Sequence, residues 1–422
     1  MPISPVIVLG GAQTDFARNW HREDLSFFDL FTECLESGLG ATSLEPEQIS
    51  VAHVGNFVGE LFTGQGMLGG WFAHVDKRFA GMPASRHEGA CASGSLAILS
   101  AMADIESGRY DVACVLGIEM MRNVPGKTAA DYLGAAAFVG EEAQDATYVW
   151  PALFSDLAEA YEERYGLDRA HLAALARKNF TNARQNPAAQ TRSWSLDDRH
   201  FSTDDAFNPV IEGHMRKHDC GQVTDGAAVV FLASPAFARN HAQRTGKTSR
   251  SQAVIEGWGH RNGPMKLATK LDAHSGEGYL FAHTRKAITD AYARAGVSGP
   301  EALDAIETHD CFSITEYMAL EHFGLTPPGQ AWRAIEDGTV DRDGALPVNP
   351  SGGLIGLGHP VGATGVRMLL DAYRQVTDTA GAMQVPGARR VGTYNVGGSG
   401  TTNCAFIVGQ AHELINGKNT LC

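Results

Sequence analysis

Four side chains, two thiols and two imidazoles, stand in positions suited to nucleophilic and acid–base chemistry. Cys91 lies in the run His-Glu-Gly-Ala-Cys-Ala-Ser-Gly-Ser, where small neighbours leave the thiol reachable and a helical pattern follows directly. The unpaired N–H groups of a helix start favour a thiolate, so we expect a lowered pKa and a nucleophilic sulfur. The alternative is a buried structural cysteine, the usual state of a free cysteine. Three others fit that alternative: Cys34, Cys114 and Cys404.

His359 lies in the stretch 349–365, which also contains six glycines and two prolines. Glycines at this density let the backbone approach a ligand closely and adopt positive φ. An imidazole in such a setting is placed for proton transfer. A glycine-rich structural turn with an incidental histidine is the alternative, because such loops are common. We favour a catalytic role for His359, because the sequence neighbours of Cys91, His309 and Cys311 are comparably unusual.

Two further turns carry polar groups directly after predicted strands. The run His309-Asp-Cys-Phe312 lies where a strand ends and a helix begins, and three reactive or polar residues in a row seldom serve packing. A helix N-cap by Asp310 or Ser313 is the competing explanation. The run Tyr394-Asn-Val-Gly-Gly-Ser-Gly400 also follows a strand, and its backbone N–H groups are free to face an oxyanion.

One possible metal site is His214-x-x-x-His218-x-Cys220, which has suitable ligand types at helical spacing. No second cluster or nearby glutamate completes it. We therefore predict an ordinary loop and no metal.

Alternating strand and helix patterns surround these turns. Strands are predicted at 5–10, 51–54, 111–118, 223–234, 253–258, 305–309, 390–395 and 404–408, and helices at 27–35, 96–105, 280–295, 314–323 and 364–376. This order predicts an α/β protein whose sheets are covered by helices on both faces. Each half has a strand, a glycine-rich turn with a reactive side chain, a helix and another strand. We infer an internal duplication whose active turns converge where strands end.

The alternation stops between residues 119 and 220, where helical patterns and polar residues dominate. We predict an inserted loop domain at 119–220, an N-terminal half formed by 1–118 and 221–250, and a C-terminal half at 251–422. The apolar, glycine-rich stretch 59–73 suits a subunit contact or a pocket wall, although an ordinary buried loop fits equally well. Six large residues line either an acyl pocket or the core: Trp71, Phe72, Met120, Met121, Tyr148 and Trp150.

Composition narrows the class of partner. The net charge of −14 argues against nucleic acid or an anionic membrane surface. Seven cysteines without regular spacing indicate a reducing compartment. No signal peptide or membrane span is apparent, so we expect a cytoplasmic protein.

Taken together, these motifs resemble the thiolase superfamily, in the family's order and over the whole chain. Cys91 matches the acyl-accepting nucleophile, and Gly-His359-Pro matches the most specific signature. The third motif usually reads Asn-Glu-Ala-Phe and the fourth Cys-x-Gly, but here they read His309-Asp-Cys311-Phe and Asn395-Val-Gly397. Both departures resemble the sterol-carrier-protein type of thiolase, in which the third motif supplies the second catalytic cysteine. The chemistry agrees, because an asparagine amide cannot titrate whereas a thiol can.

The resemblance implies a thiolase-like fold, a layered α-β-α-β-α body of two duplicated halves with the inserted loop domain binding CoA. It implies a reversible Claisen condensation, or CoA-dependent cleavage of 3-ketoacyl-CoA, through acyl-Cys91. His359 would take the thiol proton, Cys311 would move the α-proton, and His309 would help to hold the enolate. The N–H groups of Cys91 and Gly397 would hold the oxyanion, with Asn395 in a positioning role.

CoA and acyl-CoA would be substrates, with no metal or redox cofactor, and a homodimer or homotetramer is expected. Thiolases of this branch can carry a C-terminal lipid-transfer domain, for which 422 residues are too few. Two alternatives stay open. One is a ketosynthase-like condensation or a retro-aldol cleavage of a CoA thioester on the same fold. The other is a non-catalytic subunit in complex with a small OB-fold protein.

Overall fold

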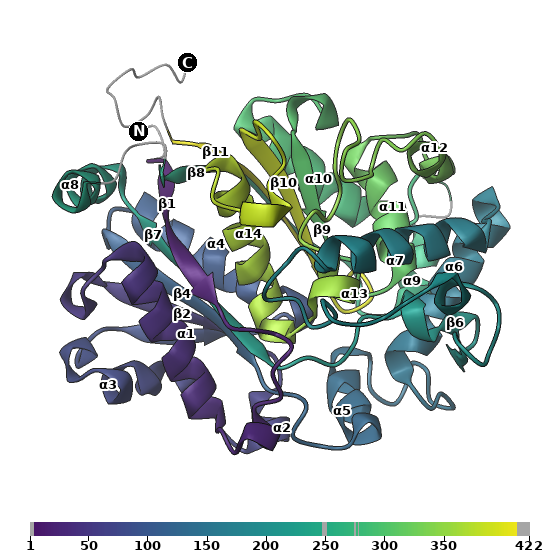
Figure 1. The fold of residues 1–422 in the computed structure, drawn as a ribbon, viewed down its shortest axis with the longest axis horizontal. Helices are drawn as coiled ribbons and strands as arrows, with labels where there is room; N and C mark the ends of the chain where they lie inside the picture. Colours follow the sequence, from purple (N-terminus) through teal and green to yellow (C-terminus); the bar gives the residue numbers. More distant parts are fainter. Residues whose placement is uncertain (1–3, 247–250, 274–275, 277, 412–422) are drawn as a thin grey trace.

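A nine-stranded mixed sheet forms the centre of the computed structural model, which describes residues 4–246, 251–273, 276 and 278–411 (Figure 1). Positions 1, 250 and 422, used above as domain limits, lie outside these residues. In spatial order the strands are β3 (Ala84–His87), β2 (Val51–Gly55), β4 (Val112–Glu119), β7 (Gly226–Ala233), β1 (Val6–Gln13), β8 (Ala253–Asn262), β11 (Thr402–Gln410), β10 (Arg390–Gly397) and β9 (Ala305–Thr308). A separate hairpin joins β5 (Val210–Glu212) and β6 (Met215–Arg216).

The sheet repeats itself about the pair β1–β8. Outward from β1, the pairings with β7, β4 and β2 are antiparallel, antiparallel and parallel. Outward from β8, the pairings with β11, β10 and β9 follow the same sequence. Even the position of β3 has a counterpart, because Val348 forms a parallel bridge with Ile306 of β9. The predicted duplication is therefore confirmed, and the two halves share one continuous sheet because β1 and β8 pair directly.

The helices lie in three layers around this sheet. The middle layer is α4 (Ser93–Glu106) against α14 (Thr364–Val376), while α1 (Phe27–Thr42) covers one half outside and α10 (Ala282–Ala295) the other (Figure 1). This order confirms the layered α/β fold. The remaining helices are α2 (Gly59–Thr63), α3 (Phe72–Val75), α5 (Gly126–Leu133), α6 (Val149–Tyr165), α7 (Arg169–Ala183), α8 (Pro235–Thr245), α9 (Leu267–Ala273), α11 (Ser313–Phe323), α12 (Ala331–Glu336) and α13 (Gly353–Leu357).

Apolar side chains at helical spacing hold the middle layer together. Ile98 and Met102 of α4 share one buried cluster with Val366 and Leu370 of α14 and with strand residues from both halves. Burial of such apolar surface stabilises the folded state by roughly 25 cal/mol per Å². Because this packing joins both halves, it brings the N-termini of α4 and α14 together.

Residues 120–225, all of them described, add no strand to the large sheet. Within this segment α7 packs against α11 and α13 of the C-terminal half. The limits 119–220 and the CoA-binding role stay predictions.

The stretch 59–73 divides between core and surface. Trp71 packs edge-on against Phe27, Phe28 and Phe31 of α1, whereas the side chain of Met67 is 87% exposed. Among the residues that the structure describes, no helix is long and apolar enough to cross a bilayer.

Candidate active site

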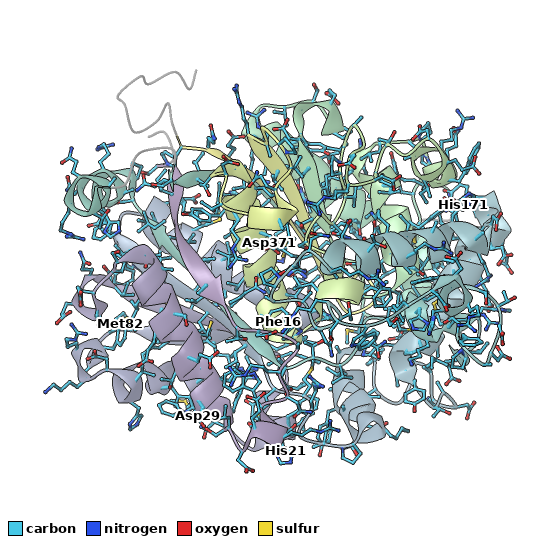
Figure 2. The ribbon with its side chains drawn as sticks, viewed as in Figure 1. Phe16, His21, Asp29, Met82, His171 and Asp371 are labelled. Carbon is cyan, nitrogen blue, oxygen red and sulfur yellow. The ribbon has the colours of Figure 1, made fainter. Side chains whose placement is uncertain are left out.

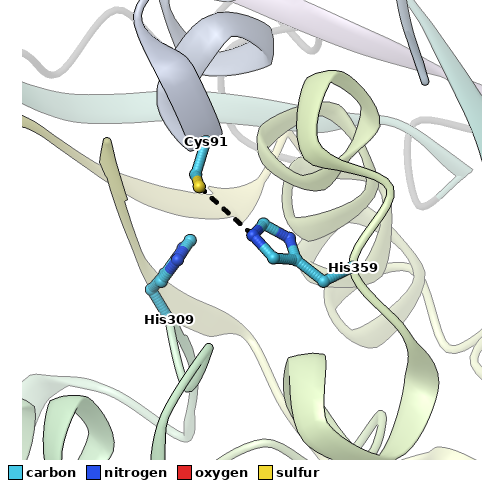
Figure 3. A group of neighbouring side chains, drawn as sticks. All are labelled: Cys91, His309 and His359. Carbon is cyan, nitrogen blue, oxygen red and sulfur yellow. Dashed lines mark hydrogen bonds between the residues drawn. The ribbon is translucent and has the colours of Figure 1, made fainter. Parts of the chain in front are cut away.

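The thiol of Cys91 and the imidazole of His359 face each other across the boundary between the halves. Nε2 of His359 lies 3.3 Å from Sγ of Cys91. His309 completes the group: the sulfur and one ligand nitrogen of each histidine all lie within 4.8 Å of one another (Figure 3). The two rings meet edge to face with centroids 5.1 Å apart. Three of the four residues singled out from the sequence therefore lie in one cluster.

Cys91 sits in a strained turn immediately before α4. It belongs to the 3-10 turn Ala90–Ala92, and Ala90 has φ 51°, a left-handed conformation that costs energy for a residue with a side chain. The hydroxyl of Ser93 holds this turn by donating to Ala90 O at 2.6 Å and accepting from Gly89 N at 3.0 Å. The turn aims the sulfur at Nε2 of His359 (Figure 3).

A second turn positions His359 between α13 and α14. The φ of 119° at Gly358 requires glycine, since a Cβ there would also lie 2.9 Å from Thr224 Cγ2. The backbone N–H of His359 donates to Thr224 Oγ1 at 2.9 Å. On the other side of the ring, Nδ1 lies 2.6 Å from Thr364 Oγ1, whose hydroxyl proton is donated to Pro360 O. Thr364 must therefore accept from Nδ1–H, which leaves a lone pair on Nε2 facing Cys91.

The resting pair is neutral. Burial raises the pKa of Cys91 to about 12, with a further rise from the charge of Glu119 and a smaller lowering by a backbone hydrogen bond from Gly398. Burial, together with the charge of Arg367, lowers the pKa of His359 to about 3. The expected lowering of the thiol pKa by the helix start is therefore wrong, because desolvation exceeds the helix-terminus effect. Activation requires transfer of the thiol proton to His359 during attack.

His309 lies beside Cys91 and His359 and has one N–H group that donates to none of the described residues. The side chain is fully buried, and its Nδ1 accepts from Asn395 Nδ2 at 2.9 Å and from Val396 N at 3.5 Å. Since Nδ1 is an acceptor, the proton of the neutral ring is on Nε2. That nitrogen has no hydrogen-bond partner among the described residues. Burial, followed by the charges of His359 and Arg367, holds the pKa of His309 well below its usual value, so the ring stays a neutral donor.

The group Cys91, His309 and His359 has the residue types of a metal site, and the position of this proton bears on whether it could bind a cation. A cation would need a lone pair on the free nitrogen of His309, but the amide of Asn395 keeps the lone pair on the opposite side. In this tautomer the three residues do not offer three lone pairs to one cation, and the absence of a metal stays a prediction. The run His214, His218 and Cys220 does not converge: His214 pairs with Glu159, His218 contacts Asn208, and the Cys220 thiol donates to Arg216 O.

Asn395 connects its own motif to the motifs of Cys91 and His309. Its Nδ2 donates to Cys91 O at 3.1 Å as well as to His309, and its Oδ1 accepts from Ser95 Oγ at 2.7 Å. All of these contacts are internal, so the amide orients neighbouring groups rather than facing the pocket.

Gly397 and Gly398 have different places. A Cβ on Gly397 would lie 2.0 Å from Gly89 O, so glycine is needed there for the approach of β10 to the Cys91 turn. The N–H that acts on the sulfur belongs to Gly398. Gly397 is the last residue of β10, and the role of its N–H as an oxyanion donor stays a prediction.

Cys311 is buried in the core of the C-terminal half, outside the three-residue cluster. Burial raises the pKa of its thiol, and so does the charge of Cys91, which places the two sulfurs within electrostatic reach. Its carbonyl accepts from Gly221 N at 2.8 Å, which ties the third motif to the segment leading into β7.

Asp310 caps a helix other than the one expected. Its carboxylate accepts from Leu354 N and Ile355 N at the start of α13 and from Asn179 Nδ2 of α7. Neither Asp310 nor Ser313 caps α11, whose N-cap is Phe312 without a side-chain bond. The aspartate thus links the His309 turn to the His359 turn.

The residues predicted to line an acyl pocket or the core belong to different apolar clusters in the structure. Met121 belongs to the apolar cluster that packs against Cys91, together with Phe57, Phe62 and Val361. Trp71, Phe72 and Met120 belong to the outer core of the N-terminal half.

Three residues that help to position the site were not predicted from the sequence: Ser95, Thr364 and Glu119. Buried Glu119 accepts from Gly362 N at 3.1 Å and Phe57 N at 3.0 Å, and so joins the turn after His359 to the end of β2. The position of each beside a motif is visible in the sequence, but its partner lies in a distant segment.

The family models match nearly the whole chain. A model described as the N-terminal domain of thiolase matches residues 6–236, and one described as thiolase C-terminal domain-like matches 268–410. An acetyl-CoA acetyltransferase of Methanothermobacter thermautotrophicus is 33% identical over 412 residues, which cover 95% of this chain and 98% of the relative. Sterol carrier protein 2 of Homo sapiens is 28% identical over 409 residues, covering 93% of this chain and 70% of the relative.

Solved structures share the fold. The Ltp2-ChsH2(DUF35) aldolase superposes with a TM-score of 0.77 at 19% identity, covering 97% of this chain and 99% of that chain. The acetyl-CoA acetyltransferase from Syntrophomonas wolfei superposes with a TM-score of 0.69 at 19% identity, with coverages of 97% and 100%. At these identities the likeness concerns architecture alone.

Proposed function

This chain belongs to the thiolase family, in its sterol-carrier-protein-type branch, and is an acyltransferase of that type; from this premise we propose that it forms and cleaves 3-ketoacyl-CoA through an acyl-cysteine on Cys91. The observation that carries the proposal is the arrangement of two imidazoles around one thiol. His359 offers a lone pair to Cys91, and His309 offers a free N–H. Such a pocket can accept a proton and stabilise a negative oxygen at once.

In the first half-reaction, Cys91 attacks the thioester carbonyl of an acyl-CoA while its proton passes to Nε2 of His359. The backbone N–H groups of Cys91 and Gly397 would hold the tetrahedral oxyanion. When the C–S bond to CoA breaks, Cys311 protonates the leaving thiolate. The products are acyl-Cys91, free CoA, protonated His359 and a Cys311 thiolate.

In the second half-reaction, the Cys311 thiolate removes the α-proton of a second acyl-CoA. The enolate oxygen would accept from protonated His359 and from Nε2–H of His309. The α-carbon attacks the acyl group on Cys91, and the released thiolate recovers its proton from His359. Protons and charges balance over the cycle, and cleavage by CoA is the reverse.

The remaining features of the proposal concern substrates and partners. CoA and acyl-CoA are the substrates, and the steps above move only protons and an acyl group, so no metal or redox cofactor takes part. The segment 119–220 would bind CoA, and the cluster around Met121 would contact the acyl group. We expect a cytoplasmic homodimer or homotetramer, with the exposed Met67 near the contact. Light scattering that shows an active monomer would rule out the oligomer.

A panel of 3-ketoacyl-CoA substrates tests the function. Loss of the 3-ketoacyl-CoA absorbance should require added CoA and produce two acyl-CoA products. Cleavage without CoA that releases an aldehyde or ketone would instead identify the retro-aldol alternative. No turnover of any substrate unless a small OB-fold protein is added would favour the role of a subunit in a complex.

A further inference from the structure

We infer that Ser95 and Asn395 are positioning residues that hold His309 as a hydrogen-bond donor and prevent it from acting as a proton acceptor. The two residues come from opposite halves of the chain, 300 positions apart. The inference about protonation stands on hydrogen-bond contacts alone. Its consequence for turnover rests on the proposed function.

The orientation of the Asn395 amide follows from its partners. Ser95 donates its hydroxyl proton to Oδ1 at 2.7 Å, and Nδ2 then faces Cys91 O at 3.1 Å. A flipped amide would place Oδ1 against that carbonyl, so that two acceptors would face each other. Cys91 O would then lose the donor that the amide supplies, which is costly because Asn395 is only 2% exposed. Only the observed orientation satisfies both contacts.

The orientation of Asn395 in turn fixes the tautomer of His309. With Nδ2 at 2.9 Å, the facing ring nitrogen must be an acceptor, and Val396 N adds a second donor on the same side at 3.5 Å. The ring proton is consequently on Nε2, which the described residues leave without a partner. Burial lowers the pKa of His309 and so opposes a second proton on the ring.

The two histidines are therefore held in opposite roles by different hydroxyls. Thr364 accepts from Nδ1–H of His359 and leaves its Nε2 as a base. Ser95, through Asn395, leaves Nε2 of His309 as a donor. A proton from Cys91 or from a substrate carbon can accordingly pass to His359 but not to His309. After acylation His359 already carries the proton of Cys91, so Cys311 is the group that takes the α-proton.

The direct test is ¹⁵N NMR of protein labelled at histidine, in which the Nε2–H and Nδ1–H tautomers give distinct pairs of nitrogen shifts. Spectra of His309→Gln identify the signals of His309 by their loss. The wild-type protein should show Nε2–H at His309 across neutral pH. An Nδ1–H signal, or fast exchange between tautomers, would overturn the inference whether or not the protein has thiolase activity.

Paired variants test whether Ser95 acts on His309 through Asn395. Asn395→Asp keeps the size but replaces the donor with an acceptor, so the His309 signals should change to the Nδ1–H pattern and kcat should fall about 100-fold, as for loss of an oxyanion donor. Ser95→Ala should mix the tautomers and lower kcat about tenfold, with KM changed less than about threefold. Ser100→Ala, on the same helix with its hydroxyl bonded to Leu96 O and 3.3 Å from Nδ1 of His87, is the matched control and should change neither the His309 signals nor kcat. Unchanged His309 signals in both Ser95→Ala and Asn395→Asp would refute the positioning role of these two residues, even if activity were lost.

Discussion

The hydroxyl of Thr364 lies 2.6 Å from Nδ1 of His359, at the opposite end of the ring from Cys91. Because Thr364 is the first residue of α14, the start of the helix directly sets which nitrogen of His359 is the base. A residue on the far side of the ring from the thiol thus determines the direction of proton transfer.

We expect Thr364→Val to lower kcat about tenfold to 100-fold while Cys91 remains intact, because Nδ1–H loses its acceptor and the base is no longer held. Thr364→Ser keeps the hydroxyl and should restore most of the turnover. Steady-state kinetics of the two variants measure the difference. Equal activity of valine and serine variants would contradict the role of the hydroxyl.

Cys91 should carry the acyl group. Mass spectrometry after incubation with an acyl-CoA should show one acyl group on the peptide that contains Cys91. Cys91→Ser should abolish turnover with the fold unchanged, since a hydroxyl facing a neutral imidazole is a far weaker nucleophile at the same position. Acylation found only on Cys311 would refute the assignment.

Cys311→Ala should separate acylation from carbon–carbon chemistry. Acylation of Cys91 should persist, although more slowly because the leaving CoA loses its proton donor. Exchange of the α-protons of acetyl-CoA with deuterated solvent should disappear. Asn395→Ala should be milder, about tenfold in kcat, because no titrating group is lost. Near-normal turnover in Cys311→Ala together with an inactive Asn395→Ala would reverse the two roles.

The neutral resting pair predicts an unusual pH dependence of thiol reactivity. With the pKa of Cys91 raised to about 12, the thiolate fraction increases tenfold per pH unit throughout the accessible range. Alkylation of the Cys91 peptide by iodoacetamide should accordingly accelerate about 100-fold from pH 7 to pH 9, without a plateau. A rate that is already constant between pH 6 and pH 8 would instead indicate a thiolate–imidazolium pair.

Arg367 is expected to be essential for stability. It is fully buried on α14, and its Nη1 contacts Glu307 at 3.2 Å and Asp371 at 3.0 Å (Asp371 is labelled in Figure 2). Arg367→Met leaves buried Glu307 without its cation and Asp371 with Arg374 alone, and should cost about 3–5 kcal/mol of unfolding free energy in urea. Arg374→Met removes a partly exposed partner of the same aspartate and should cost about 1 kcal/mol or less. Similar losses in both variants would show that burial does not determine the cost.

The sequence alone was sufficient for the family, the alternation of strands and helices, and three of the residues that meet in the pocket. These features are local: hydrophobic periodicity and glycine-rich turns appear in consecutive residues such as 353–365. The helix capped by Asp310 was missed, because it depends on where neighbouring turns approach one another.

Only the tertiary structure decided the protonation states. The pKa of Cys91 depends on how completely packing excludes water, and a helix-start pattern carries no information about that. The tautomer of His309 depends on Asn395, whose orientation depends on Ser95 in the other half of the chain. Long-range packing of α4 against α14 creates these contacts, so side chains far apart in sequence determine which nitrogen carries the proton.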